Sequence, residues 1–156
     1  METLDEEKDA FWLKMVAMDD EKLYQTVQFL RTPFVERGDP IENVVEFDDK
    51  CDIYLLYKGD TPVATARMMY VPEHGWKISR ISVLKESQKQ GYGSKIVRDL
   101  ISLYSTKLKD QEWIYLSSFL DILSFYDKLG FERSGEVFID EHGYTLQTMV
   151  FPRDRI

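Results

Sequence analysis

The sequence predicts an α/β (α+β) fold, in which helices pack on a layer of β-strands. Strand-like segments with alternating or β-branched apolar residues are interspersed with segments whose apolar residues recur at helical spacing. Several of the strands come as hairpins joined by turns rich in Gly, Asp and Pro. The 156 residues, 44% of them hydrophobic, have the length and apolar content of one domain. We therefore predict a single domain over residues 1–156, with residues 1–9 as a loose tail.

The first half of the chain predicts a strand, a helix and a hairpin. Residues 10–18 alternate loosely between apolar and polar and predict the first strand. A helix follows to about Leu30, with Asp19 or Asp20 available as its N-cap. Residues 31–50, which contain two prolines and a glycine, predict an irregular segment that could include a short helical piece. Residues 51–58 and 63–71 predict two strands around a turn at residues 59–62.

The second half predicts two further helices and four further strands. Residues 76–84 and 112–118 predict strands, and residues 131–139 and 144–151 predict a final hairpin. A helix begins after the stretch SQKQGYGSK at residues 87–95, and its apolar rows are Ile96, Leu100 and Tyr104, with Val97 and Ile101 beside them. A second helix is predicted over residues 121–129. Ser118 with Asp121 resembles a capping box before it, and Gly130 stands where it ends.

Composition excludes some classes of function. The net charge of −8 disfavours a general nucleic-acid binder, because phosphate binding needs concentrated positive charge. An acidic protein suits cationic partners or amine substrates instead. No stretch approaches the ~20 apolar residues of a membrane span, and the acidic N-terminus lacks a secretory signal. Cys51 is the only cysteine, so no internal disulfide is possible, which predicts a cytoplasmic protein.

The stretch SQKQGYGSK predicts an anion site. It places glycines between a strand and a helix, where the first N–H groups of the helix have no internal partner and the helix dipole favours negative charge. A P-loop does not fit, and a dinucleotide fingerprint lacks its third glycine at Ile96, although Glu112 lies where a ribose-binding acid would fall. Residues 88–93 fit the pattern Q/R-x-x-G-x-G/A throughout. An ordinary strand-to-helix turn is the alternative interpretation.

With this loop, the sequence resembles the GNAT superfamily of N-acetyltransferases. Residues 78–100 resemble the acetyl-CoA segment of that family, residues 63–68 its preceding strand, and residues 122–131 (ILSFYDKLGF) its second signature. The resemblance extends over residues 52–150 and implies a mixed, mostly antiparallel central sheet of six or seven strands flanked by helices. Within the superfamily, the stretch around Arg31 and Glu36 is similar to the ElaA-like branch, although Leu146 stands where such members often have a histidine.

The resemblance also implies where acetyl-CoA binds. The main chain at the end of the fourth strand would bind the pantetheine arm, and the loop would bind the pyrophosphate. These cofactor-binding residues are Ile81, Ser82 and Val83 in the strand and Gln88, Lys89, Gln90, Gly91, Tyr92, Gly93 and Ser94 in the loop. Lys95 could add positive charge nearby. Phe119 stands where many relatives place an Asn or Gln that touches the coenzyme.

Tyr126 matches the general acid of the family, which serves the leaving thiolate of the coenzyme; the alternative is a core aromatic residue. The acceptor amine must also lose a proton. The candidate bases are Glu36, Glu46, Asp48, Asp49 and Glu73, which the sequence does not rank. Arg67 and Arg80 could line the cleft or pair with acids. The histidines His74 and His142 lie far apart in sequence, and no metal site is expected.

The sequence thus predicts an acyltransferase that moves an acetyl group from acetyl-CoA to an unidentified primary amine by direct attack in a ternary complex. The expected partners are acetyl-CoA and this amine, with a homodimer as one option and no nucleic acid or membrane. A non-catalytic acyl-CoA-binding module that senses the coenzyme or scaffolds a partner is the main alternative. A nucleotide-dependent oxidoreductase is a third.

Overall fold

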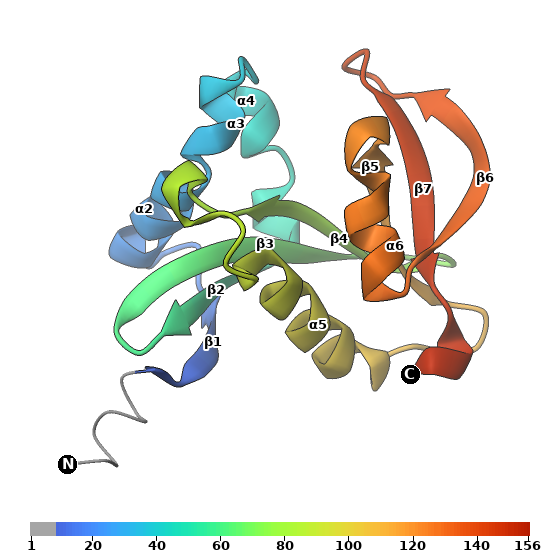
Figure 1. The fold of residues 1–156 in the computed structure, drawn as a ribbon, viewed down its shortest axis with the longest axis horizontal. Helices are drawn as coiled ribbons and strands as arrows, with labels where there is room; N and C mark the ends of the chain where they lie inside the picture. The colour runs from blue at the N-terminus through green and yellow to red at the C-terminus, as the bar shows by residue number, and fades with distance from the viewer. Residues whose placement is uncertain (1–8) are drawn as a thin grey trace. The chain divides into compact units, whose positions relative to one another are not determined.

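The computed structural model describes residues 9–156, so most of the predicted N-terminal tail lies outside the described residues. The described chain folds as a seven-stranded sheet in the order β1-β2-β3-β4-β5-β7-β6 with helices (Figure 1). The pairs β1–β2, β2–β3, β5–β7 and β6–β7 are antiparallel, and β4–β5 is parallel. The predicted α/β class with a mostly antiparallel sheet is therefore confirmed.

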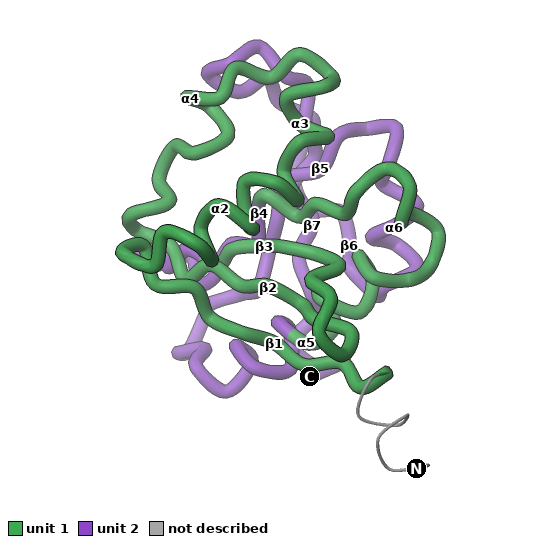
Figure 2. Tube along the Cα trace, turned by 90° about the vertical axis from the view of Figure 1, so that its left-hand side faces the viewer, with its two compact units in different colours: residues 1–68, 80–99 green, residues 69–79, 100–156 purple. Residues whose placement is uncertain are grey.

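The chain divides into two compact units, coloured separately in Figure 2. Unit 1 comprises the chain up to Met68 together with Arg80–Asp99, and unit 2 comprises Met69–Ser79 and Leu100–Ile156. Each unit is built from two segments that are separate in the sequence, so β3, β4 and α5 each contribute to both. The single domain stays a prediction.

Unit 1 begins with β1 (Phe11–Val16) and α2 (Glu21–Leu30). The Asp20 side chain accepts a hydrogen bond from the Leu23 N–H at 3.2 Å, which confirms the predicted N-cap. The hairpin of β2 (Asp52–Lys58) and β3 (Thr61–Val71) follows. Its turn is tighter than predicted, because Thr61 and Pro62 already pair within β3. The core of this unit joins β1, α2 and β2 through Val16, Val27, Leu30, Ile53 and Leu55.

Residues 31–50 are more helical than the sequence predicts. They form α3 (Thr32–Glu36), α4 (Ile41–Val44) and a 3₁₀ turn at Asp48–Lys50. Pro33 lies in the first turn of α3, where a proline is tolerated because its missing N–H would have no partner anyway. Each helix has at most a turn or so, which is why the apolar periodicity is too short to reveal it in the sequence.

The remaining elements are β4 (Gly75–Ser82), α5 (Tyr92–Ser105), β5 (Trp113–Phe119), α6 (Leu123–Leu129), β6 (Glu132–Ile139) and β7 (Thr145–Phe151). The predicted apolar rows of α5 are buried. Gly130 ends α6 in the left-handed conformation, as predicted. In unit 2, the rings of Tyr126, Phe131 and Phe151 pack edge to face between α6 and β7.

The predicted capping box at α6 is wrong. Ser118 still belongs to β5, and its hydroxyl donates to the Phe119 carbonyl at 2.8 Å. A 3₁₀ turn at Leu120–Ile122 separates the strand from α6, whose N-cap is Ile122 without a capping side chain. Phe119 is therefore the last residue of β5 rather than the start of the helix.

Candidate functional site

The glycine-containing loop lies in unit 1 between β4 and α5. After a 3₁₀ turn at Lys85–Ser87, the backbone takes a positive φ at Lys89 (70°) and again at Gly91 (84°). The Gly91 carbonyl then accepts from the Lys95 N–H at 3.0 Å, which opens α5. The 14-residue helix α5 thus begins directly after the second left-handed residue of the loop, and its first N–H groups belong to the glycine-containing stretch.

The main-chain N–H groups of Lys89–Ser94 have no hydrogen-bond acceptor among the described residues. Those of Tyr92, Gly93 and Ser94 belong to the first turn of α5, where no earlier turn supplies a carbonyl. Most of the loop is exposed, so water satisfies these donors in the free protein. A run of adjacent N–H groups at a helix N-terminus is suited to bind a phosphate-type anion.

Gly91 is required by the backbone conformation and not by lack of space. A Cβ atom added to Gly91 would meet no heavy atom within 4 Å, yet the φ of 84° is one that side-chain-bearing residues rarely adopt. The sequence therefore selects glycine here to hold the turn that presents the loop N–H groups.

Side chains of the loop fix its position. The Gln88 amide donates to the Val83 carbonyl at 3.2 Å, and the Tyr92 hydroxyl donates to the Gln90 side chain at 3.0 Å. The Tyr92 ring is buried and packs edge to face on Phe11 of β1. Lys95 instead pairs with Asp99 at 2.9 Å along α5. Its charge is therefore partly engaged within the helix.

The predicted pantetheine segment leads directly into this loop. Ile81 is half-buried, and Ser82 and Val83 are buried. The Ser82 hydroxyl donates to the Leu30 carbonyl at 2.6 Å, which attaches the end of β4 to the end of α2. Unit 1 thus brings together all the predicted cofactor-binding residues, from the strand end to the first turn of α5.

Tyr126 lies in unit 2, in the middle of the seven-residue helix α6. It is 7% exposed, and its ring packs against Phe125 and Phe131. Its hydroxyl has no hydrogen-bond partner among the described residues. Burial raises the pKa of Tyr126 to about 12, so the phenol stays protonated at neutral pH. It can donate a hydrogen bond and is a poor source of a fully transferred proton.

Unit 1 also contains a buried ion cluster that the sequence did not predict as a unit. The Asp48 carboxylate accepts from both terminal nitrogens of Arg31 at 2.7 and 3.0 Å, from Arg67 at 2.7 Å and from the Tyr24 hydroxyl at 2.6 Å. Arg31, Asp48 and Arg67 are all at most 3% exposed. The partners come from α2, the 3₁₀ turn and β3, so no local spacing in the sequence links them.

This cluster removes Asp48 from the candidate bases. Burial alone would raise the pKa of the Asp48 carboxyl, but the hydrogen bonds and charge of Arg31, with the bonds of Tyr24 and Arg67, hold the pKa below its ordinary value. A carboxylate stabilised in this way has little tendency to accept a proton. Of the other candidates, Glu46 is half-buried, whereas Glu36, Asp49 and Glu73 are exposed.

Arg80 lies in β4 with a φ of 52°, an uncommon value for a residue with a side chain. Its guanidinium donates to the Val44 carbonyl at 2.9 Å and to the Asn43 carbonyl at 2.7 Å. Such a conformation costs on the order of 1 kcal/mol and persists only when the surroundings fix it. Here the two hydrogen bonds to the end of α4 fix the side chain.

Glu112, the acid considered for a dinucleotide site, has a structural role in unit 2. Its carboxylate accepts from the Lys109 N–H at 2.9 Å and from the Tyr70 hydroxyl. The residue is buried, and it closes the connection between α5 and β5. These two hydrogen bonds occupy the Glu112 carboxylate, which a bound ribose would need as its acceptor.

Comparison with known proteins identifies the family. A family model described as an acetyltransferase (GNAT) domain matches residues 49–133, which is more than half of the chain. The chain belongs to the GNAT acetyltransferase family. The matched range includes the strand end, the glycine-containing loop and Tyr126. The prediction from the sequence is thereby confirmed at the level of the family, and with it the class of acyltransferase.

Individual relatives agree with this family. YyaT, an uncharacterized protein of Bacillus subtilis (strain 168), is 29% identical over 113 residues, which cover 72% of this chain and 74% of YyaT. The crystal structure of Escherichia coli ElaA has a TM-score of 0.71 at 20% identity and covers 89% of this chain and 99% of ElaA. A Bacillus subtilis acetyltransferase in complex with CoA has a TM-score of 0.62 at 20% identity, with 90% and 95% covered. These structures show the shared GNAT fold.

No helix within residues 9–156 has both the length and the apolar character needed to cross a membrane.

Proposed function

We propose that this GNAT protein binds acetyl-CoA and transfers its acetyl group to a primary amine by direct attack in a ternary complex. The observation that carries the proposal is the run of unpartnered main-chain N–H groups at Lys89–Ser94, at the start of a 14-residue helix. Each donor contributes modestly, about 0.3–1 kcal/mol for an exposed helix terminus, so several must converge on one pyrophosphate. The CoA complex of a protein with the same fold supports this choice of ligand.

In the proposed complex, Gln88–Ser94 hold the pyrophosphate, and the main chain of Ile81–Val83 holds the pantetheine arm. An amide-bearing chain can hydrogen-bond to a strand end much as a neighbouring strand does. The order of these segments along β4 and the loop would direct the thioester away from α5. Cys51 is a free cysteine assigned no part in the transfer, and its presence fits a cytoplasmic reaction.

The chemical step balances without a covalent enzyme intermediate. The neutral amine nitrogen attacks the thioester carbon, the C–S bond breaks with its electron pair on sulfur, and the nitrogen loses one proton. A lysine-like amine with a pKa of about 10.4 is neutral in only ~1 of 2,500 molecules at pH 7, a handicap of about 4.6 kcal/mol. We assign the removal of this proton to a carboxylate of residues 31–50, with Glu46 as the half-buried candidate.

Tyr126 is proposed to donate a hydrogen bond to the departing thiolate. With its pKa raised to about 12 and a reference thiol near 8.5, complete proton transfer would run uphill by roughly 5 kcal/mol. The reference pKa of a free tyrosine, about 10, gives a smaller gap, so burial favours donation of a hydrogen bond over full transfer. Stabilising developing charge in this way is sufficient to lower the barrier.

Replacing Tyr126 by Phe tests the proposal. We expect kcat for thiol release from acetyl-CoA to fall roughly 100-fold or more, because Phe lacks the hydroxyl that would donate a hydrogen bond to the departing thiolate. The aromatic ring stays in place. The dissociation constant for CoA, measured by calorimetry, should stay unchanged. Tyr115→Phe is the control, since Tyr115 is a half-buried tyrosine of unit 2 whose pKa is also raised by burial. Equal loss of kcat in both variants would remove Tyr126 from the mechanism.

Calorimetry also tests the function itself. A lack of heat with CoA and with every thioester of it would refute the proposed function.

A further inference from the structure

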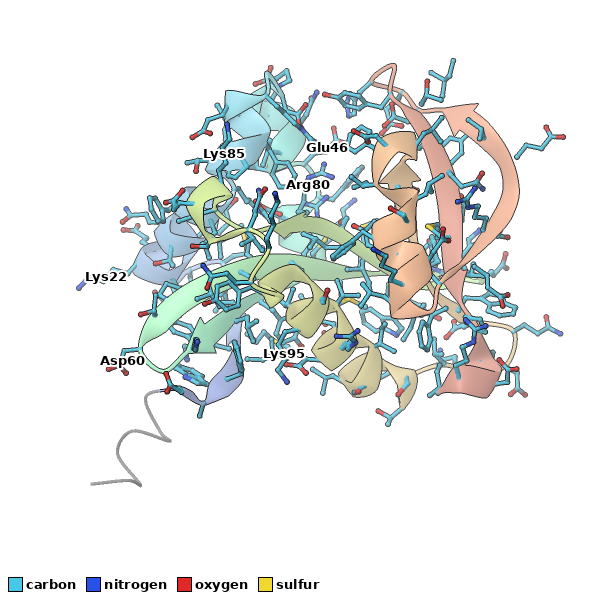
Figure 3. All side chains as sticks on the ribbon, in the orientation of Figure 1. Lys22, Glu46, Asp60, Arg80, Lys85 and Lys95 are labelled. Carbon is cyan, nitrogen blue, oxygen red and sulfur yellow. The ribbon has the colours of Figure 1, made fainter. Side chains whose placement is uncertain are left out.

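Unit 1 gathers more buried positive charge than negative charge next to the proposed coenzyme segment. Arg31 and Arg67 both bind Asp48 directly. Arg80 reaches the same region from β4, and its charge also interacts with Glu46. Figure 3 labels Arg80 and Glu46, whose side chains lie near each other. Among these groups of unit 1, three guanidinium groups therefore interact with two carboxylates, and positive charge predominates around Arg80.

Arg80 is the member of this group that has donors to spare. A guanidinium carries five N–H donors in one plane, and Arg80 uses its Nε and one Nη2 donor on main-chain carbonyls. Both acceptors are neutral, and Arg80 forms no ion pair at contact distance within the described residues. The side chain is half-buried, so the remaining donors are reachable.

The electrostatics of Arg80 indicate the sign of the missing partner. Burial, followed by the nearby charges of Arg67 and Arg31, lowers the pKa of Arg80 to about 10. Asp48 and Glu46 act in the opposite direction but do not cancel these effects. Burial disfavours a charge of either sign, but the charges of Arg67 and Arg31 disfavour only a further cation and attract an anion.

Position along the chain indicates which anion. Arg80 directly precedes Ile81–Val83, the segment proposed to bind pantetheine, and the pyrophosphate loop lies on the far side of that segment. In the proposed complex the phosphates lie at the loop end of this segment, and Arg80 lies at the other end, where the thioester would meet the acceptor. The hydrogen bonds to Asn43 and Val44 hold its guanidinium in place, so the site is ordered before the acceptor binds.

We propose that the acceptor is an amine that also carries a carboxylate, as an amino acid does, and that Arg80 binds this carboxylate. The proposal rests on the proposed function and names the substrate class of the same site. A carboxylate suits a guanidinium whose hydrogen bonds within the described residues go only to neutral carbonyls, and a planar guanidinium can donate two parallel hydrogen bonds to it. Arg80 is then a specificity-determining residue of the acyl transfer.

The test compares matched amines with and without a carboxylate: lysine against cadaverine, phenylalanine against phenethylamine, and methionine against 3-(methylthio)propylamine. Thiol release from acetyl-CoA gives kcat and KM for each. We expect kcat/KM to be at least about tenfold higher for the amino acid of a pair that is turned over, since a site built to bind a polar group rejects analogues that lack it.

Arg80→Met should erase most of this preference by raising KM for the amino acid, with kcat and the calorimetric affinity for CoA little changed. Arg80→Lys should restore part of it. Because each preference is a ratio within one variant, partial loss of folded protein cancels. Arg37→Met is the matched control, since Arg37 is an exposed arginine of the same 31–50 region that pairs with Asp39 at 2.7 Å. It should leave the ratio unchanged.

Three results would overturn the inference: decarboxylated amines that react as well as amino acids, a ratio that Arg80→Met does not alter, or no turnover of any carboxylate-bearing amine. In each case, heat on CoA binding or thiol release with other amines would leave the proposed function standing. A protein that neither binds CoA nor releases thiol with any amine would refute both.

Discussion

Around Asp48, side chains from three elements converge on one buried carboxylate, whereas the N–H groups of Lys89–Ser94 have no acceptor in the described part of the chain. Both regions belong to unit 1, and both are polar. One is closed and satisfied within the protein. The other is open and satisfied by water or by a ligand.

The difference separates scaffold from binding surface. A buried carboxylate is tolerated only when it is paired and hydrogen-bonded, so the Asp48 cluster must be complete in order for residues 31–50 to fold. Exposed N–H groups carry little free-energy penalty while water binds them, so the donors of the loop can stay without a protein acceptor until a ligand binds. Substitutions in the first region should therefore affect folding, and substitutions in the second should affect coenzyme affinity.

The largest effect is expected for Asp48→Asn. This change keeps the shape of the side chain but leaves Arg31 and Arg67 buried without a counter-charge, which typically costs about 3–5 kcal/mol of unfolding free energy. Urea denaturation would measure it. Asp49→Asn makes the same charge change at the exposed neighbouring residue and should shift stability by less than about 0.5 kcal/mol. Equal effects of the two substitutions would show that the cluster does not stabilise the fold.

Lowering the pH should reduce the unfolding free energy by less than Asp48→Asn does, because protonation neutralises the Asp48 carboxylate but leaves the side chain in place. The pKa of Asp48 lies below its ordinary value of 3.8 in the folded protein. Its contribution to stability is therefore fully present above that value and is lost as the pH falls through the folded-state pKa. Unfolding free energies between pH 7 and pH 3 should decline less steeply in Asp48→Asn than in the wild type. Parallel declines would contradict the assignment, and Asp49→Asn should follow the wild type.

Sequence reasoning located the loop because its information is local. Glycines between a strand and a helix dictate backbone conformation within a few residues, and the first N–H groups of any helix lack partners. The apolar rows of α5 were predictable for the same reason, since a short-range period reports the face that a helix buries. The hairpin of β6 and β7 was predictable from the local turn between its strands, although β6 itself is exposed along its length.

The Asp48 cluster was not predictable, because its pairs are 17 and 19 residues apart in the sequence and have no shared spacing. Arg31 and Asp48 were each singled out, one as part of a branch resemblance and one as a candidate base, but nothing in the sequence joined them. The capping box failed for a related reason. Whether Ser118 ends a strand or starts a helix depends on how far β5 pairs with β7, and Ser118 pairs with Gln147.

The smallest effect on folding, and the sharpest test of the comparison, is expected for Gly91→Ala. The added methyl group meets no neighbour, so the loss of stability is limited to the positive φ and should be about 1 kcal/mol. Relaxation of that φ would turn the N–H groups of the loop away from a common anion, so calorimetry should show CoA affinity falling at least roughly tenfold.

Gly38→Ala is a matched control, because Gly38 also has a positive φ (105°) and open space around an added Cβ. It should lose similar stability and keep its CoA affinity. If Gly38→Ala weakened CoA binding as much as Gly91→Ala does, the affinity loss would reflect general destabilisation, and the unpartnered N–H groups would no longer explain it.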